Sequence, residues 1–322
     1  MVKILANDGI DASGKSLLEN AGFKVDTVKI PQDQLAAGIQ AGGYEVVLVR
    51  SATKITASII DACPGIRMLG RAGVGMDNID IKHAESRGIK VFNTPAASSQ
   101  SVAELVLAHL FSGVRFLQDS NHRMRHDGTT AFNELKKHYS AGSELQGKTL
   151  GIIGFGRIGQ ALARMAIGMG MKVLASDPFL DEVELLMTFS QDGSSHKMRI
   201  MTIPMKELLM NSDFVSLHVP GKVNGKAVLG EEELRIMKRG SGIVNAARGG
   251  VIDEDALLEA LNSGQLAFVG LDVFENEPSP RADILTHPRI SVSPHIGAST
   301  AEAQERIAAE LAQTIIAFYA NK

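Results

Sequence analysis

The stretch Gly154-Phe155-Gly156-Arg157-Ile158-Gly159, in the middle of the chain, decides how the fold is interpreted. It follows a short apolar run, residues 148–153, that has the β-branched content of a buried parallel strand. In such a loop the first glycine permits a tight turn and the second lets the backbone approach a pyrophosphate. The third lets the following helix pack closely on the strand. The stretch therefore predicts a dinucleotide-binding site.

The residues after this loop support the same prediction. A helix is expected over residues 158–167, and the free N–H groups and dipole at its N-terminus favour phosphate. A second expected strand, residues 171–176, ends at Asp177, about 20 residues after the loop. A carboxylate there accepts hydrogen bonds from the adenosine ribose of NAD and repels the 2′-phosphate of NADP. Glycines also serve ordinary turns, but strand, loop, helix, strand and acid in this order predict NAD as the cofactor.

Composition excludes several classes of protein. The 322 residues suffice for two domains with separate cores, and the formal net charge of -3 provides no basic field for nucleic acid or anionic membranes. The single cysteine, Cys63, rules out an internal disulfide. No apolar run reaches the ~18 residues of a membrane span, and the first strand leads directly into Asn7-Asp8-Gly9, unlike a signal peptide. We therefore expect a cytoplasmic protein that binds neither nucleic acid nor membranes.

Strand-like and helix-like segments alternate along almost the whole chain, which predicts parallel sheets with crossover helices. The strands expected in the first hundred residues are 2–6, 23–28, 46–50, 68–71 and 90–92. After the strand that ends at Asp177, further strands are expected at 214–219, 243–247, 267–273 and 290–293. The last helix, about 301–320, has nothing left to pack on in a completed nucleotide domain, so we expect it to return to the first domain.

The expected fold is α/β, with two doubly wound parallel-sheet domains. A Rossmann-type NAD domain, residues 99–292, is inserted into a discontinuous flavodoxin-like substrate domain formed by residues 1–98 and 293–322. A long helix with an apolar stripe is expected over residues 101–125, where it crosses between domains or pairs with a second subunit. The polar stretch Gln191–Lys197 is expected to be a surface excursion without chemistry.

Among the nine histidines, His295 is the candidate proton acceptor. It follows the expected strand 290–293, and ligands bind outside the carboxyl ends of strands in such sheets. The small residues Gly297-Ala298-Ser299 after it leave room for a substrate. A solvated or structural role is expected for the histidines in helical or polar surface patterns, which are His83, His109, His122, His126, His138, His196 and His287.

Arg248 is the candidate ligand for a substrate carboxylate. It ends the expected strand 243–247, and its guanidinium can hold a carboxylate with two hydrogen bonds. The alternative, a surface ion pair, does not explain the two glycines that follow it. A carboxylate beside His295 would fix its tautomer and raise its pKa, but spacing does not choose among Asp272, Glu275 and Glu277.

Four motifs, taken in order along nearly the whole chain, resemble the D-isomer-specific 2-hydroxyacid dehydrogenases. They are G-F-G-R-I-G (154–159), N-A-A-R-G-G-V-I-D (245–253), L-D-V-F-E-N-E-P (271–278) and S-P-H-I-G-A-S-T (293–300). The resemblance implies that Arg248 binds the substrate carboxylate and that Glu277 pairs with the acid–base His295. It implies a cofactor domain inserted into a discontinuous catalytic domain, with a cleft between them. The NAD contacts that it implies are Val74, Gly154, Gly156, Arg157, Ile158, Gly159, Asp177, Val219, Ala246, Ala247, Arg248, Asp272 (at the nicotinamide carboxamide), His295, Gly297 and Ala298.

Within that family, residues 49–54 and 70–78 resemble the members that oxidise 3-phosphoglycerate with NAD at the first step of L-serine biosynthesis. Arg50 and Arg71 each end an expected strand, and a substrate with a carboxylate and a phosphate needs cations at both ends. The expected substrate contacts are Arg50, Ser51, Arg71, Gly73, Gly75, Arg248 and His295. The alternatives are a glyoxylate or hydroxypyruvate reductase, which needs no second group of cations, a broad D-2-hydroxyacid dehydrogenase, and an NAD-sensing binding protein of the same fold. For the two arginines themselves, the alternative is that both are surface charges.

The chain departs from the family pattern in two places. The stretch Gly128–Glu144 is longer than its counterpart and lacks a usual tryptophan. The resemblance implies that a basic residue here, Lys136 or Lys137, reaches the substrate of the neighbouring subunit in a homodimer, and the sequence does not choose between them. The chain stops at Lys322 directly after the returning helix, so we expect it to lack the small-ligand regulatory domain of many relatives.

Overall fold

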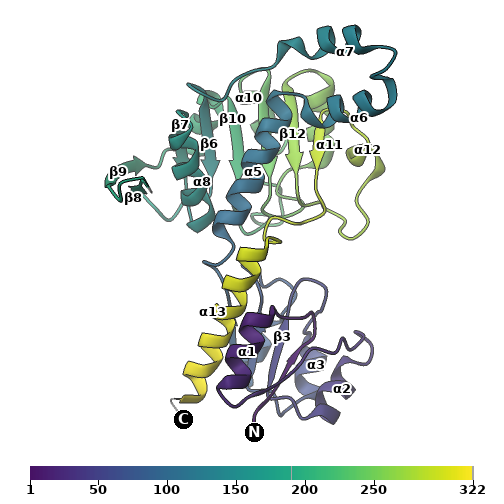
Figure 1. The fold of residues 1–322 in the computed structure, drawn as a ribbon, viewed down its shortest axis with the longest axis vertical. Coiled ribbons are helices and arrows are strands. Elements are labelled where there is room, and N and C mark those ends of the chain that lie inside the picture. The colour runs from purple at the N-terminus through teal and green to yellow at the C-terminus, as the bar shows by residue number, and fades with distance from the viewer. Residues whose placement is uncertain (190, 321–322) are drawn as a thin grey trace. The chain divides into compact units, whose positions relative to one another are not determined.

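The chain divides into two compact units in a computed structural model that describes residues 1–189 and 191–320. Unit 1 consists of Met1–Ser99 and Ala298–Lys322, and unit 2 consists of Gln100–Gly297. Each unit is built on its own parallel sheet (Figure 1). We predicted the second change of domain at 292/293, whereas residues 293–297 lie with unit 2. The buried Asp272 of that unit holds them by accepting hydrogen bonds from the backbone N–H groups of Ile296 and Gly297.

Unit 1 contains a five-stranded sheet in the order β2-β1-β3-β4-β5, which is the flavodoxin-like order. Its strands are β1 (Lys3–Ala6), β2 (Lys24–Asp26), β3 (Val46–Val49), β4 (Met68–Arg71) and β5 (Lys90–Asn93). Its helices are α1 (Ala12–Asn20), α2 (Leu35–Gly42), α3 (Ala57–Ala62), α4 (Ile81–Ser86) and α13 (Ala301–Ala320). The last helix does return to the first domain, where it packs against α1. Gly14 allows this approach, because a Cβ there would lie 2.5 Å from the Cβ of Ala308.

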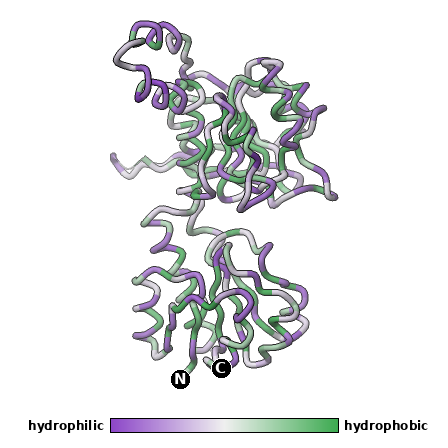
Figure 2. Tube along the Cα trace, turned by 90° about the vertical axis from the view of Figure 1, so that its right-hand side faces the viewer, coloured by the Kyte–Doolittle hydropathy of each residue, from purple (hydrophilic) through white to green (hydrophobic). Residues whose placement is uncertain are grey.

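The central strands of unit 1, which are β1, β3 and β4, are buried on both faces, which explains their nearly continuous apolar sequences. Alternate residues point to opposite faces, so Leu5, Val47 and Leu69 pack in one apolar cluster. Their neighbours along the strands pack in a second cluster that includes residues of α13. In Figure 2 the hydrophobic residues accordingly concentrate along the strands inside each unit.

Unit 2 contains a six-stranded parallel sheet in the order β13-β12-β11-β10-β6-β7. Its strands are β6 (Thr149–Ile153), β7 (Lys172–Ser176), β10 (Phe214–Leu217), β11 (Ser241–Asn245), β12 (Leu266–Leu271) and β13 (Ile290–Val292). Its helices are α5 (Ser99–Val114), α6 (Leu117–Asp127), α7 (Phe132–His138), the 3-10 helix η1 (Tyr139–Ala141), α8 (Arg157–Gly168), α9 (Met205–Asn211), α10 (Glu231–Ile236), α11 (Glu254–Asn262) and α12 (Ala282–Leu285). The strand order reverses between β6 and β10, and ligands bind beyond the carboxyl ends of strands at such a point. None of the helices described in either unit is long and apolar enough to cross a membrane.

The single helix predicted over residues 101–125 is wrong, because the chain forms α5 and α6 with a break between them. Phe116 adopts a left-handed backbone conformation with φ 52° and ends the helical path. The apolar stripe of α5, including Val106 and Leu110, is buried in the core of unit 2 and needs no second subunit to cover it. Beyond the break, α6 has no buried side chain. The stripe in the sequence continued past Val114 and concealed this change of environment.

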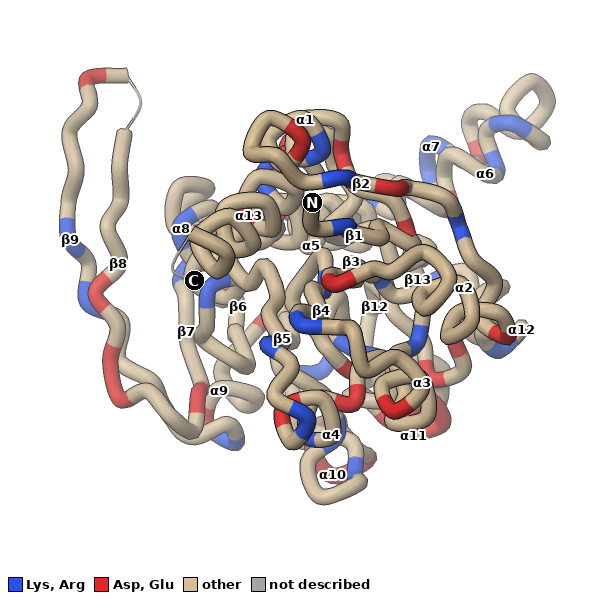
Figure 3. Tube along the Cα trace, turned by 90° about the horizontal axis from the view of Figure 1, so that it is seen from below, with Lys and Arg blue, Asp and Glu red and all other residues tan. Residues whose placement is uncertain are grey.

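Between β7 and α9 the chain forms an antiparallel hairpin that the sequence analysis did not predict. Its strands are β8 (Glu182–Thr188) and β9 (Ser195–Met201). Acidic residues of β8 pair with basic residues of β9, with Glu184 2.7 Å from Lys197 and Glu182 3.4 Å from Arg199. Figure 3 shows acidic residues along β8 and basic residues along β9. The exposed excursion expected at Gln191–Lys197 is therefore the turn and the beginning of β9.

Candidate active site

Two of the three glycines of the loop after β6 are required by the packing of the chain, and the third leaves open space. Gly154 has φ 87°, and a Cβ there would lie 2.5 Å from the carbonyl oxygen of His218. A Cβ at Gly159 would lie 2.4 Å from the carbonyl oxygen of Gly154, so this glycine lets α8 approach the strand. At Gly156 a Cβ would meet nothing within 4 Å, and the residue caps the helix that begins at Arg157. The open space at Gly156 and the free helix N-terminus fit a pyrophosphate group.

Asp177 is held against this loop. One carboxylate oxygen, Oδ2, accepts a hydrogen bond of 2.8 Å from the backbone N–H of Phe155, and Oδ1 accepts one of 2.9 Å from that of Phe179. A carboxylate has about four lone-pair sites, so both oxygens can still accept hydrogen bonds from ribose hydroxyls. The side chain is thus oriented before any ligand binds.

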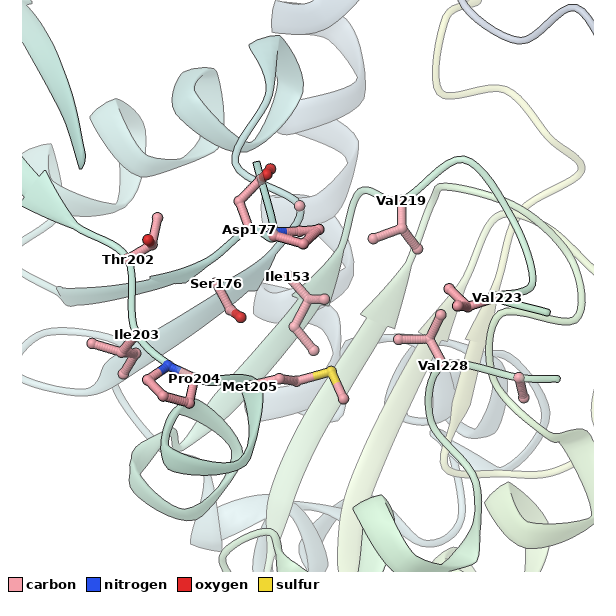
Figure 4. A pocket seen from close by; sticks show the side chains of 13 residues that line it. Ile153, Ser176, Asp177, Thr202, Ile203, Pro204, Met205, Val219, Val223 and Val228 are labelled. Atoms are coloured by element: carbon pink, nitrogen blue, oxygen red, sulfur yellow. The ribbon is translucent and has the colours of Figure 1, made fainter. Parts of the chain in front are cut away.

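A cavity of about 690 Å³ opens beside Asp177. In Figure 4 Thr202 and Ile203 lie on one side, Val219, Val223 and Val228 on the other, and Ile153 and Ser176 between them. Gly154, Pro178, Pro204, Met205 and Ala227 complete the lining. Its volume lies in the range of small-molecule pockets, about 300–1,000 Å³. A mainly apolar slot beside a carboxylate suits the adenosine half of a dinucleotide, and most of its wall comes from loops that no sequence motif marked.

The first prediction concerns the choice of cofactor. Replacing Asp177 with alanine should lower the ratio of kcat/KM for NAD to that for NADP by roughly ten-fold or more. The variant loses charge-assisted hydrogen bonds of about 1.5–3 kcal/mol and the repulsion of the 2′-phosphate. Steady-state kinetics with both cofactors measure the ratio, and D177N separates the effect of the charge from that of the side chain. A wild-type preference for NADP would contradict the role of Asp177.

His295 and Glu277 form a hydrogen-bonded pair in unit 2. Nδ1 of His295 lies 2.8 Å from Oε2 of Glu277, and Oε1 of Glu277 accepts a hydrogen bond of 3.0 Å from the backbone N–H of Phe274. Of the three acids that spacing left open, Glu277 is thus the one beside His295, whereas Glu275 lies 3.2 Å from Lys222. An N–H donated from Nδ1 to Glu277 leaves Nε2 of His295 as a proton acceptor.

The loop that carries Arg248 packs against the turn that leads to Glu277. The side chain of Asn245 holds this loop, accepting from the backbone N–H of Ala247 at 3.0 Å and donating to the carbonyl of Arg248 at 2.9 Å. A Cβ at Gly249 would lie 1.8 Å from the carbonyl oxygen of Phe274, so only glycine permits this contact. The glycine after Arg248 therefore brings the guanidinium-bearing loop and the acid-bearing turn together.

In unit 1, Arg50 and Arg71 lie at the carboxyl ends of adjacent strands. Val49 of β3 is in register with Arg71 of β4, and Arg50 is the next residue. Gly73 leaves room for the guanidinium, since a Cβ there would lie 1.8 Å from Nη1 of Arg71. The neighbouring Ser51 is exposed. Two cations thus share one edge of the sheet.

Asp8 fixes the loop that follows Arg50, and the sequence analysis did not identify it as a site residue. Its Oδ2 accepts hydrogen bonds from the backbone N–H groups of Arg50 at 2.7 Å and Thr53 at 3.2 Å, and Oδ1 accepts from the Thr53 hydroxyl at 2.7 Å and from Lys29. Asn78 donates to the carbonyls of Arg50 and Thr53 at 2.7 and 2.6 Å. The available signal was an acid directly after the first strand, at the same sheet edge as Arg50.

The second prediction follows from the titration of Asp8. Burial raises the pKa of Asp8, but hydrogen bonds from Lys29 and Thr53 outweigh it and hold the pKa below its usual value. A depressed folded-state pKa stabilises the fold above the unfolded-state pKa, and that stability is lost as the pH falls. D8N should therefore be less stable than wild type at pH 7 and should lose less stability on acidification below about pH 5. Urea unfolding at several pH values measures the free energy of unfolding, and D33N, at an exposed site, is the control. If the free energy of unfolding depends on pH in the same way in D8N and wild type, the prediction is contradicted.

The remaining residues predicted to contact NAD are divided between the two units. Val74 and Ala298 belong to unit 1, whereas Ile158, in the first turn of α8, and Ala246, in the Arg248 loop, belong to unit 2. Gly75, a predicted substrate contact, is in unit 1. Gly297 of unit 2 is buried beside Asp272, a residue that is only 1% exposed. Within unit 2, the glycine loop, the Asp177 pocket and the His295–Glu277 pair together define a nucleotide-dependent dehydrogenase site.

Comparison with known proteins specifies this class. The family model described as "D-isomer specific 2-hydroxyacid dehydrogenase, NAD binding domain" matches residues 107–297, and the chain belongs to this family. It is 40% identical over 317 residues to a hydroxypyruvate reductase of Thermotoga maritima, covering 97% of both chains. It is 36% identical to a D-3-phosphoglycerate dehydrogenase of Bacillus subtilis, covering 99% of this chain but only 57% of the relative.

A solved structure agrees with this assignment. The NAD-bound 3-phosphoglycerate dehydrogenase of Entamoeba histolytica matches 99% of this chain and 96% of its own, with a TM-score of 0.78 and 27% identity. The chain is therefore a D-2-hydroxyacid dehydrogenase that uses NAD. Its residues fit the cofactor, since the glycine loop and Asp177 offer the donors and acceptors that NAD requires.

Proposed function

We propose that the protein reversibly oxidises 3-phospho-D-glycerate to 3-phosphooxypyruvate with NAD, the first step of L-serine biosynthesis. The observation that carries this proposal is the pair of cations, Arg50 and Arg71, at one edge of the unit 1 sheet. Among the described residues the Arg50 guanidinium has no hydrogen-bond or ion-pair partner, although Asp8 and Asn78 hold its backbone on both sides. A cation left uncommitted on a rigid loop suits the phosphate of the substrate, while Arg248 serves the carboxylate.

In the proposed mechanism His295 is the general base. Its Nε2 removes the proton of the C2 hydroxyl, and the adjacent Glu277 carboxylate stabilises the resulting imidazolium. Arg248 holds the substrate carboxylate through two hydrogen bonds and so orients the C2–H bond. The glycine loop and Asp177 would hold NAD, which would supply the acceptor for the hydride of C2. In the reverse direction the His295 imidazolium returns the proton to the carbonyl oxygen.

A second candidate is hydroxypyruvate reduction, which the 40% identity to the Thermotoga enzyme over the full length of both chains favours. Hydroxypyruvate carries no phosphate, so this activity needs no second group of cations. The decisive experiment compares kcat/KM for 3-phosphooxypyruvate with that for hydroxypyruvate, glyoxylate and pyruvate, all with NADH. A preference for hydroxypyruvate over 3-phosphooxypyruvate would overturn the proposed substrate. Absence of turnover with every 2-hydroxy or 2-oxo acid would favour an NAD-sensing binding protein.

The third prediction concerns assembly. We propose a homodimer that covers the exposed apolar side chains around α6 and α7, among them Leu117, 58% exposed, and Phe132, 56% exposed. Light scattering at micromolar concentration should report a dimer, and the double variant L117E/F132E should be a monomer with unchanged secondary structure. L186E, at a half-exposed leucine of the β8–β9 hairpin, is the matched control and should remain dimeric. A monomeric wild type would refute the proposal and with it any role for Lys136 or Lys137 in a partner's site.

A further inference from the structure

A buried polar network surrounds His109 of α5, and the reaction as proposed makes no use of it. The side chain is inside unit 2, and the residue is 4% exposed. Its Nε2 lies 3.0 Å from the hydroxyl oxygen of Ser293, and its Nδ1 lies 2.9 Å from that of Ser291. Gly270 makes room for the ring, because a Cβ there would lie 2.6 Å from the Cβ of His109. Burial lowers the pKa of His109, with Asp272 opposing the shift, so the ring is neutral at neutral pH.

The hydrogen bonds determine where the protons of this network lie. The Ser293 hydroxyl donates to Oδ1 of Asp272 at 2.6 Å, and a hydroxyl has one proton to donate. Ser293 must therefore accept from His109, which requires the proton of the neutral ring to be on Nε2. Nδ1 then accepts from the Ser291 hydroxyl. The result is a directed chain from His109 through Ser293 to Asp272, in which every polar hydrogen has an acceptor.

Asp272 connects this chain to the loop that carries His295. Its Oδ1 also accepts from the backbone N–H of Ile296 at 2.8 Å, and its Oδ2 accepts from that of Gly297 at 2.8 Å. The carbonyl of Gly297 accepts a hydrogen bond of 2.6 Å from the Ser101 hydroxyl. Within this loop His295 has φ 54°, a left-handed conformation that residues other than glycine adopt only when neighbouring contacts impose it. The backbone position of His295 thus depends on the orientation of the Asp272 carboxylate.

We propose that His109 is a positioning residue for His295, acting through the Ser293 hydroxyl and the Asp272 carboxylate. The inference rests on the proposed role of His295 as the acid–base. The Nε2–H of His109 fills the acceptor site of Ser293 and directs the Ser293 proton to Asp272. Without it the Ser293 hydroxyl is free to rotate, Asp272 loses its shortest hydrogen bond, and the loop that carries His295 loses its fixed position.

Kinetics of H109L, S293A and the double variant test this proposal. Each single variant should lower kcat at saturating substrate and NAD by about 10- to 100-fold, because small displacements of catalytic groups have effects of this size. The double variant should show no greater loss than the single variants, since both changes break one chain. H109Q, whose side-chain amide can donate to Ser293, should recover part of kcat.

Controls separate positioning from plain stability. S291A removes a hydroxyl on the far side of the ring, away from Asp272, and should leave kcat within about two-fold of wild type even where its melting temperature falls. Additive losses in the double variant, wild-type kcat in S293A, or an equal loss in S291A would each overturn the inference. Should H109L fail to fold, S293A and H109Q still decide the question. Full activity in H295A would instead overturn the proposed function, which distinguishes the two failures.

Discussion

Replacing His295 with alanine is expected to lower kcat by about 100-fold or more, while NAD still binds. General acid–base catalysis contributes about 10²–10⁴-fold, and the variant loses the proton acceptor that Glu277 orients. The Asp177 pocket and the glycine loop involve other residues of unit 2, so the dissociation constant of NAD should change little. Steady-state kinetics at saturating substrate and NAD measure the first quantity, and isothermal titration calorimetry with NAD measures the second.

A matched variant, E277Q, tests whether the carboxylate acts through the histidine. Glutamine keeps an acceptor for the backbone N–H of Phe274 but removes the negative charge beside the imidazole. The loss of that charge should lower kcat, because the imidazolium that forms in the reaction loses the carboxylate that stabilises it. Full activity in H295A would refute the assignment of the base, and wild-type kcat in E277Q would refute the role of the pair.

The sequence predicted the parallel strands of both units well, because the central strands, such as β3 and β10, are fully buried and consist of mostly apolar residues. The sequence-based prediction failed where the local pattern carried no information about what a segment packs against in the fold. The stripe of α5 continues into Leu117, and nothing in the spacing showed that Phe116 turns the chain away from the core. The hairpin β8–β9 was missed because its charged residues, such as Glu184 and Lys197, resemble those of a solvated loop.

The candidate site was predictable where a single motif contains both the functional residue and the neighbouring residues that explain its role. In the glycine loop, spacing alone specified a turn, a backbone approach and a helix contact. The choice of Glu277 needed either the family resemblance or the structure, because three acids occur within six residues of one another. Asp8 was missed, and His109 was expected to be solvated or structural, for a physical reason: their partners, Arg50 and Ser293, lie far away in the sequence and are adjacent only in the folded units.

The phosphate ligands should show the second large effect. R50A and R71A are each expected to raise KM for 3-phosphoglycerate roughly ten- to a hundred-fold, because a charge-assisted contact contributes about 1.5–3 kcal/mol. In R50A the loop itself should persist, since Asp8 and Asn78 bind backbone atoms of this residue. Initial-rate kinetics with 3-phosphoglycerate and with the unphosphorylated D-glycerate measure the effect.

The comparison between the two substrates separates recognition from folding. D-glycerate lacks the phosphate, so R50A and R71A should alter its KM far less than that of 3-phosphoglycerate. R67A is the matched control, because Arg67 precedes the amino end of β4, at the opposite edge of the sheet from Arg71, and pairs with Glu45 at 3.0 Å. Some of the loss with 3-phosphoglycerate should appear in kcat if the remote phosphate contributes binding energy to the transition state. Equal losses with both substrates would mean that the arginines support the fold, and no loss with either would favour hydroxypyruvate as the substrate.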